Sequence, residues 1–325
     1  MKKTILALSA ALLTVISVNA QEGKASVKVF SNFNYDLSDG EREHAYKAFE
    51  IKRAYLGYGY NFDDKLSAKI TFDVGAGSDA VSVYTAYLKI AALSWKASDK
   101  LTLNFGQVGT KNFKFQEKVW GKRYIAKSAQ DEHKWASSAD AGVTADYKVS
   151  DKLSIDAQVL NGEGYKKSQG ENGKFRGGLG ITYVMSDRIA LRVHRDITPR
   201  NTYGENDASQ HINALAIAYT GSNFNLGIEK AKMINSKNVL DSKNDLLSVF
   251  GNYNLSDKYA IFGRYDNLTS KEDLNIANDG NYTVFGIERQ MTKGVKVAIN
   301  VQSWTSAAEG TEAARTLYMN LGYTF

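Results

Sequence analysis

A short unit recurs along this chain and limits what it can fold into. A turn that carries Ser or Asp beside Lys or Arg is followed by a segment with large apolar residues at alternate positions, as in FDDKLSAKITF, ASDKLTLNF, KVSDKLSIDAQVL, MSDRIALRV and LSDKYAIFG. Weaker turns, TGSN from Thr220 and MTKG from Met291, continue the series. A turn therefore recurs about every 35 residues, with one longer interval between Lys100 and Lys152. Such a period indicates a repeated structural unit.

The segments after the turns have two unlike faces. In residues 66–74, Leu66, Ile70 and Phe72 lie on one face of an extended chain, while Lys69 and Asp73 lie on the other. Residues 295–302 alternate in the same way. Because a period of two is typical of strands whose faces meet different surroundings, each unit is predicted to be a hairpin turn and a strand.

The pattern predicts about sixteen strands. They are expected to begin near residues 25, 47, 66, 81, 101, 138, 153, 174, 189, 210, 223, 245, 259, 281, 295 and 315. Short turns alternate with long polar loops, as in an outer-membrane barrel with short periplasmic turns and long extracellular loops. Closing the sheet leaves no unpaired backbone groups in lipid, and the single proline, Pro199, fits a paired sheet. The predicted fold class is therefore all-β, a transmembrane antiparallel β-barrel.

A soluble sandwich or propeller is the alternative for a chain with many short strands. The mean hydropathy of −0.37 does not exclude a membrane barrel, because only alternate residues face lipid. Tyr58, Tyr60 and Phe62 precede one short turn, and Tyr147 and Tyr183 precede two others. Aromatic residues at these positions are expected in an interfacial girdle, which favours the membrane barrel.

The N-terminal residues 1–20 are predicted to be a signal peptide. Lys2 and Lys3 precede the apolar run ILALSAALLTVIS and the small-residue end VNA, so cleavage is expected after Ala20. The mature chain, residues 21–325, is then expected to form one barrel domain. Loss of two lysines lowers the net charge from +6 to +4, too little to indicate nucleic-acid binding. The absence of cysteine excludes disulfides and thiolate metal sites.

The C-terminal segment RTLYMNLGYTF alternates up to Phe325. It resembles the terminal strand by which the outer-membrane assembly machinery recognises porins. That resemblance makes Tyr323 and Phe325 the expected assembly signal, and the assembly machinery and outer-membrane lipid the expected partners. Termini of soluble chains are usually solvated, so an apolar final residue is itself informative.

The longest connection, about residues 108–137, is the third long loop. In general porins, which this arrangement resembles, the third loop folds into the barrel and narrows the pore. Its basic residues would then favour anions; the alternative is a solvated surface loop. These residues are Lys111, Lys114, Lys118, Lys122, Arg123 and Lys127.

The strand alternation also predicts charged residues on the lumen wall. The basic ones are Lys69, Lys89, Lys148, Arg176, Arg192, Arg264 and Lys296. Acids share that face, namely Asp73, Asp140, Asp146, Asp156 and Glu229. Mixed charge is usual in a water-filled lumen, so charge counting supports at most a slight anion preference.

No catalytic or metal-binding pattern is found. The four histidines are His44, His133, His194 and His211, and neither GxSxG nor HExxH occurs. The cluster Asp131–His133 is too short to indicate a metal site. The chain is predicted to be neither an enzyme nor a cofactor binder.

Two stretches go beyond general barrel features. In AFEIKRAYLGYGYNFDDKLSAKITFDVG and LNFGQVGTKNFKFQEKVWGKRYIA, the chain resembles the phosphate-selective porin O/P family. The matching residues are Phe49, Ile51, Arg53, Ala54, Asp73, Gly106, Gln107, Lys111, Glu117 and Arg123. Asn112 stands where the family often has proline, and no dense arginine ladder is found. The resemblance implies a trimeric 16-stranded channel and leaves phosphate selectivity open.

These observations predict a porin in the outer membrane of a Gram-negative bacterium. Small hydrophilic solutes and ions would diffuse passively through it, with a mild preference for anions. The alternative is a non-conducting barrel that serves as an adhesin or structural surface protein through its long loops.

Overall fold

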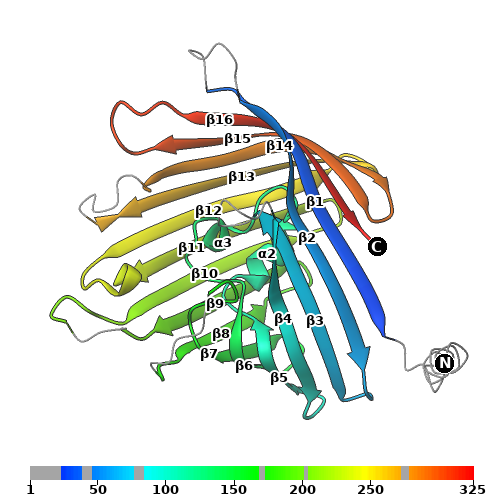
Figure 1. Ribbon diagram of the computed structural model, residues 1–325, viewed down its shortest axis with the longest axis vertical. Coiled ribbons are helices and arrows are strands. Elements are labelled where there is room, and N and C mark those ends of the chain that lie inside the picture. The colour runs from blue at the N-terminus through cyan, green and yellow to red at the C-terminus, as the bar shows by residue number, and fades with distance from the viewer. Residues whose placement is uncertain (1–22, 39–45, 77–83, 168–172, 201–203, 272–277) are drawn as a thin grey trace, which may run out of the picture.

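The structure is a computed structural model that describes residues 23–38, 46–76, 84–167, 173–200, 204–271 and 278–325. In this part of the chain sixteen antiparallel strands form a closed barrel (Figure 1). The predicted fold class is therefore confirmed. The strand starts differ from the predicted ones by at most three residues. The largest difference concerns residues 81–83, which, like the expected signal peptide, lie outside the described residues.

Each strand pairs with its neighbours in the chain, and β1 pairs with β16. The bounds are β1 Lys24–Asp36, β2 Lys47–Asn61, β3 Leu66–Ala76, β4 Tyr84–Lys96, β5 Leu101–Gly109, β6 Ala139–Lys148, β7 Leu153–Leu160, β8 Arg176–Val184, β9 Ile189–Thr198, β10 Gln210–Thr220, β11 Phe224–Ile234, β12 Lys243–Asn254, β13 Tyr259–Ser270, β14 Gly280–Thr292, β15 Val295–Ser306 and β16 Ala314–Thr324.

The recurring turn has a recurring hydrogen-bond pattern. The Ser98 hydroxyl accepts hydrogen bonds from the backbone N–H groups of Lys100 and Leu101, at 3.3 and 3.2 Å. The same two bonds form at Ser150, Ser186 and Ser256, and a carboxylate oxygen of Asp63 takes this role in the turn before β3. The side chain thus holds backbone donors that the turn leaves unpaired, which explains why Ser or Asp recurs there.

The barrel closes through its last residue. The backbone N–H of Val27 donates to the carbonyl of Phe325 at 2.8 Å, and the N–H of Phe325 donates to the carbonyl of Val27 at 3.1 Å. Tyr323 lies opposite Val29 on one side and Val295 on the other. The terminal segment therefore completes the ring of strands, which has no free edge.

The two faces of the wall differ as the alternation predicted. Large apolar side chains are exposed on the outer face, including Phe49 at 83%, Phe285 at 69% and Ile299 at 53%. The inner face carries polar and charged side chains such as Asn32, Asp73 and Arg192, which are buried. A band of exposed apolar side chains around a closed sheet is unfavourable in water and favourable in hydrocarbon.

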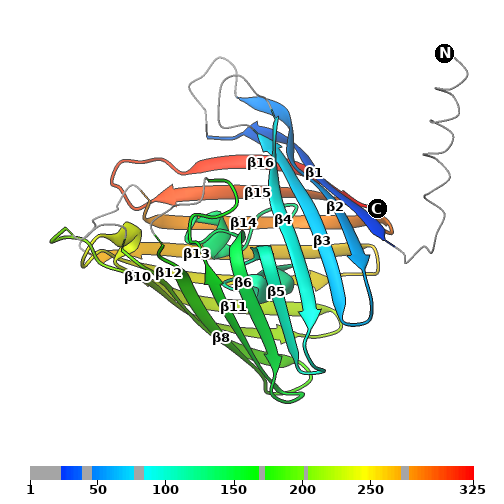
Figure 2. The ribbon, with the colours of Figure 1, turned by 60° about the horizontal axis from the view of Figure 1, so that its bottom comes forward.

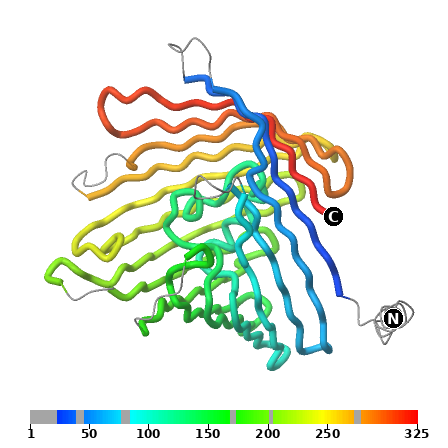
Figure 3. Tube along the Cα trace, viewed as in Figure 1, coloured from blue at the N-terminus to red at the C-terminus, as the bar shows by residue number. Residues whose placement is uncertain are grey.

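The space inside the ring is partly filled by chain. The connection between β5 and β6 carries two short helices, α2 (Lys114–Trp120) and α3 (Ala129–Glu132). In Figure 2 both helices lie inside the ring of strands, and the tube in Figure 3 shows this connection running across the interior. Among the described residues, no helix is long and apolar enough to cross a membrane.

Candidate functional site

The β5–β6 connection, residues 110–138, is called the inner loop below. Its helix α2 ends at Gly121, whose φ of 63° lies in the left-handed region that glycine adopts without steric cost. After that turn the Trp120 ring N–H donates to the carbonyl of Ala126 at 2.9 Å. This bond holds the chain after helix α2 close to the helix end.

The inner wall is apolar where the inner loop rests on it. Trp120 packs edge-on against Phe250 and Phe262, with ring centroids 6.1 and 6.2 Å apart. Ala129 and Trp135 of the loop pack on a second apolar area of the wall, formed by Ile212, Ala214, Ala231, Met233, Leu246 and Leu268. Since these wall residues would otherwise face water, their burial stabilises the loop in its inward position.

Charged wall residues anchor the inner loop as well. Glu288 on β14 accepts hydrogen bonds from Lys122 and from the Tyr124 hydroxyl, each at 2.8 Å. Glu229 on β11 is fully buried and accepts from Gln116 at 2.6 Å and from Gln130. His133 Nε2 lies 2.9 Å from the carboxylate of Asp266 on β13. These contacts reach the wall that lies across the barrel from β3 and β4.

Lys111 anchors the beginning of the inner loop. Its ammonium lies 2.6 Å from Asp146 on β6, and its backbone N–H donates to Gln158 at 2.7 Å. Arg192 on β9 donates to its carbonyl oxygen at 2.8 Å. Lys111 is therefore buried with its charge compensated, and it fixes the loop more than it adds positive charge to the lumen.

The three predicted wall arginines face inward, each beside a carboxylate. Arg176 lies 2.5 Å from Asp196, and Arg192 lies 2.6 Å from Asp156. Arg264 contacts Asp266 and also donates to the carbonyl of Lys127 in the inner loop. Three of the four predicted wall lysines also lie near a carboxylate: Lys89 near Asp73, Lys148 near Asp151 and Lys296 near Glu288.

A cavity of about 820 Å³ lies between the inner loop and the wall formed by β3 to β6. Six cations line it, namely Lys69, Lys89, Lys111, Lys114, Lys118 and Arg123, against the two carboxylates Glu117 and Asp146. Within the described part of the chain, no ion pair is found for Lys69, Lys114 or Lys118. The cavity wall therefore carries an excess of positive charge.

Lys114 has an unusual environment in this cavity. Its pKa is lowered to about 8, mainly because the surrounding protein desolvates the ammonium and next because Lys111 lies nearby, against the opposing effects of Asp146, Asp156 and Glu117. Its charge is thus partly lost just above neutral pH. Lys122, which burial also affects, has a lowered pKa despite its contact with Glu288.

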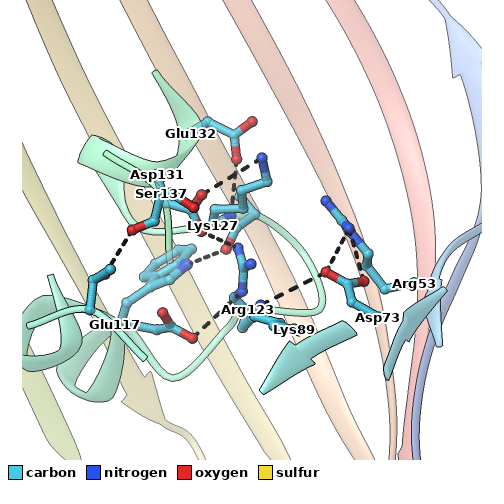
Figure 4. Close-up of polar contacts among 12 residues, drawn as sticks. Arg53, Asp73, Lys89, Glu117, Arg123, Lys127, Asp131, Glu132 and Ser137 are labelled. Atoms are coloured by element: carbon cyan, nitrogen blue, oxygen red, sulfur yellow. Dashed lines mark hydrogen bonds and ion pairs between the residues drawn. The ribbon is translucent and has the colours of Figure 1, made fainter. Parts of the chain in front are cut away.

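Arg123 separates this cavity from a second one of about 330 Å³, because it lines both. Its guanidinium lies 3.0 Å from Asp131 and 3.5 Å from Glu117 (Figure 4). Burial lowers the pKa of Arg123, but Asp131, Tyr55 and Glu117 outweigh that effect and raise it above its ordinary value. Arg123 therefore stays charged where it lines the two cavities.

A cluster on β2, β3 and β4 lies beside Arg123. The Arg53 guanidinium lies 2.9 Å from both carboxylate oxygens of Asp73, and the Lys89 ammonium lies 3.9 Å from it (Figure 4). The hydroxyl of Tyr165, from the β7–β8 connection, also donates to Asp73. Lys89 lies over the rings of Tyr55 and Tyr165, at 4.8 and 5.3 Å from their centroids.

Two irregularities in strand pairing lie at this cluster, one next to Arg53 and one at Lys89. The β1–β2 register skips Lys52, and the β3–β4 register skips Lys89. A β-bulge of this kind re-aims side chains next to functional sites. Sequence reasoning found Lys89 and Asp73 on the inner face but missed Tyr165 as a site residue, because its loop carries no alternation.

The remaining candidates have structural partners. Asp131 and His133, considered above as a metal cluster, contact Arg123 and Asp266 respectively. Within the described residues, no group of three or more His, Asp or Glu side chains is arranged to hold a metal ion. His194 is buried on β9, 3.3 Å from Arg192.

No protein-family model matches this chain, and no curated protein matches it. Several solved structures do match it, and two of them are outer-membrane porins. OmpF of Salmonella typhi is 13% identical with a TM-score of 0.69, covering 94% of this chain and 98% of that one. The anion-selective porin from Comamonas acidovorans is 10% identical with a TM-score of 0.69, covering 94% and 99%.

OmpT of Vibrio cholerae, described as an outer membrane protein and solved in a trimer form, is 14% identical with a TM-score of 0.61, covering 94% and 99%. At such identities the likeness concerns the fold. The chain therefore shares the β-barrel fold of outer-membrane porins.

Proposed function

We propose that this protein is an outer-membrane porin through which small hydrophilic solutes and ions diffuse, with a mild preference for anions. The observation that carries the proposal is the lumen cavity lined by six cations and two carboxylates, three of the cations having no ion-pair partner within the described residues. Uncompensated charge in a low-dielectric wall raises the local concentration of the opposite ion. The apolar outer band supports a membrane location.

The proposal also includes a constriction in the lumen, a homotrimeric assembly and a C-terminal assembly signal. The inner loop forms the constriction, and Lys118 and Arg123 line it together with Lys114. Catalysis and a cofactor have no place in this mechanism. The trimer form of OmpT and the resemblance to the phosphate-selective porin O/P family support a homotrimer. The closure of the barrel through Phe325 supports a role of the C-terminal strand, with Tyr323, in recognition by the assembly machinery.

A non-conducting barrel is the alternative function, and one observation favours it. The inner loop and the cluster around Asp73 meet near Arg123, between the two cavities. If side chains close the passage there, the protein would act at the cell surface through its long loops. Electrical recording separates the two functions.

The protein inserted in a planar lipid bilayer is expected to give discrete conductance steps, because a water-filled lumen carries ions. In a salt gradient of about 0.1 M against 0.3 M, the reversal potential should show anions to be the more permeant ions. Low salt is needed since the Debye length falls to about 3 Å at 1 M and screening then hides the wall charge. A folded protein without steps would contradict the channel and support the alternative.

The anion preference is expected to weaken as the pH rises from about 7 to 9. Lys114, with its pKa lowered to about 8, is charged below that pH and neutral above it, so one positive charge leaves the cavity. Reversal potentials measured across this range check the prediction. Lys114→Gln is the matched control, because it should start with a weaker preference and change less over the same pH range. An equal step in both proteins would assign the titration to another group.

A further inference from the structure

The outer face carries a patch of basic residues on four adjacent strands, β9 to β12, near their long-loop ends. The members of this basic patch are Arg195, Lys230, Lys232 and Lys243, with His211 beside them. On β11 the exposed Lys230 and Lys232 alternate with buried Glu229, Ala231 and Met233. Since the buried residues face the lumen, the two lysines project outward, away from the channel.

The strand register brings these residues together. Arg195 lies opposite Asn213, Asn213 opposite Lys232, and Lys232 opposite Asp245, so they form one row across four strands. Two strand spacings, about 10 Å, separate the backbones of Arg195 and Lys232. Lys232 lies 3.4 Å from Asp245, both partly exposed. With four cations and one carboxylate, the basic patch keeps an excess of positive charge.

Its position on the outer face is distinctive. The outward positions of the described strand residues in β3 to β8 carry no charged side chain. Lys230 lies between Leu215 and Leu247, at the end of the apolar band, and Lys232 lies one row further toward the long loops. A charge costs about 2–4 kcal/mol at the middle of a bilayer but about 0–1 near its surface. The patch thus lies where acyl chains give way to headgroups.

We propose that the basic patch binds the phosphate group of an anionic lipid in the leaflet around the long-loop end. This inference rests on the membrane location proposed above. Arg195 can hold two phosphate oxygens with its planar guanidinium, while lysines extend from their apolar stems toward a headgroup. The ligand is a lipid because the patch borders the apolar band, where Leu215 and Leu247 can contact its acyl chains.

Native mass spectrometry of the detergent-solubilised protein tests the inference, with phosphatidic acid as the phosphate-bearing lipid and phosphatidylcholine as the zwitterionic comparison. The wild type should retain phosphatidic acid preferentially. The variant Arg195→Gln/Lys230→Gln/Lys232→Gln should lose about 100-fold in affinity, because each basic residue near an anionic lipid contributes about fivefold. The matched control, Lys47→Gln/Arg289→Gln/Arg315→Gln, removes three exposed cations elsewhere on the barrel and should bind as the wild type does.

The proposal fails if the triple variant binds phosphatidic acid as tightly as the control, or if the wild type does not prefer it to phosphatidylcholine. It also fails if inorganic phosphate displaces the lipid at equal concentration, since the site would then hold a free anion. The heat-dependent shift in gel mobility verifies that each variant is folded. If the triple variant does not fold, the single variant Lys232→Gln takes its place in the test. Conductance reports separately on the channel: a conducting barrel without lipid preference overturns only this inference.

Discussion

Replacing Lys69, Lys114 and Lys118 together by glutamate is expected to change the protein from anion-preferring to cation-preferring. The change leaves three cations and five carboxylates on the wall of the 820 Å³ cavity, so its net charge changes sign. The ratio of anion to cation permeability should fall by about tenfold or more. Reversal potentials in a salt gradient below about 0.3 M measure the ratio.

The choice of these three lysines follows from the contacts. Lys111 is left unchanged because glutamate there would face Asp146, and the buried anchor of the inner loop would be lost. The control, Lys100→Glu/Lys152→Glu/Lys293→Glu, changes the overall charge equally, at exposed turns that do not line the cavity. If both variants keep the wild-type preference, the cavity is not the ion pathway; if both shift equally, overall charge sets selectivity.

The strands could be predicted from the sequence because their signals are local. A turn residue that holds backbone donors, such as Ser150 or Ser256, lies a few positions before five of the strands, β3, β5, β7, β9 and β13, and the alternation then assigns the faces. In residues 66–74 this reasoning placed Asp73 on the inner face and Phe72 on the outer face, where the structure has them. Local patterns of this kind survive folding because they do not depend on distant partners.

The partners of the charged residues could not be predicted in the same way. Lys122 and Glu288 are 166 residues apart, and the barrel brings them to 2.8 Å. Nothing near Lys122 distinguishes it from Lys118, which has no ion pair among the described residues. The bulges at Lys52 and Lys89 likewise leave no mark, because one extra residue in a strand only interrupts the alternation.

The sequence of β10 carries a further signal. Residues 210–220, QHINALAIAYT, are apolar on both faces: Leu215 and Ile217 face outward, while Ile212 and Ala214 face inward. A strand of this kind is expected to be covered on both sides. In a water-filled barrel, an apolar inner face therefore indicates the part of the wall on which an inserted segment rests.

That interpretation leads to the second large effect. Replacing residues 113–136 by a short Gly-Ser linker is expected to raise the single-channel conductance severalfold and to remove most ion preference, because the inner loop fills the lumen and carries Lys114, Lys118 and Arg123. Phe250, Ile212 and the wall residues around them would then face water, so the barrel should also unfold at a lower temperature.

Single-channel recording and thermal unfolding followed by circular dichroism measure the two effects on one variant. The control shortens the β15–β16 connection, residues 307–313, which lines neither lumen cavity and should leave conductance unchanged. Both measurements are needed because together they distinguish a loop that is packed in the lumen from a loop that lies outside it. Higher conductance with lower stability means that the loop is packed in the lumen in the membrane. Unchanged conductance with unchanged stability would mean that it lies outside, and the constriction proposed for Arg123 would be lost with it.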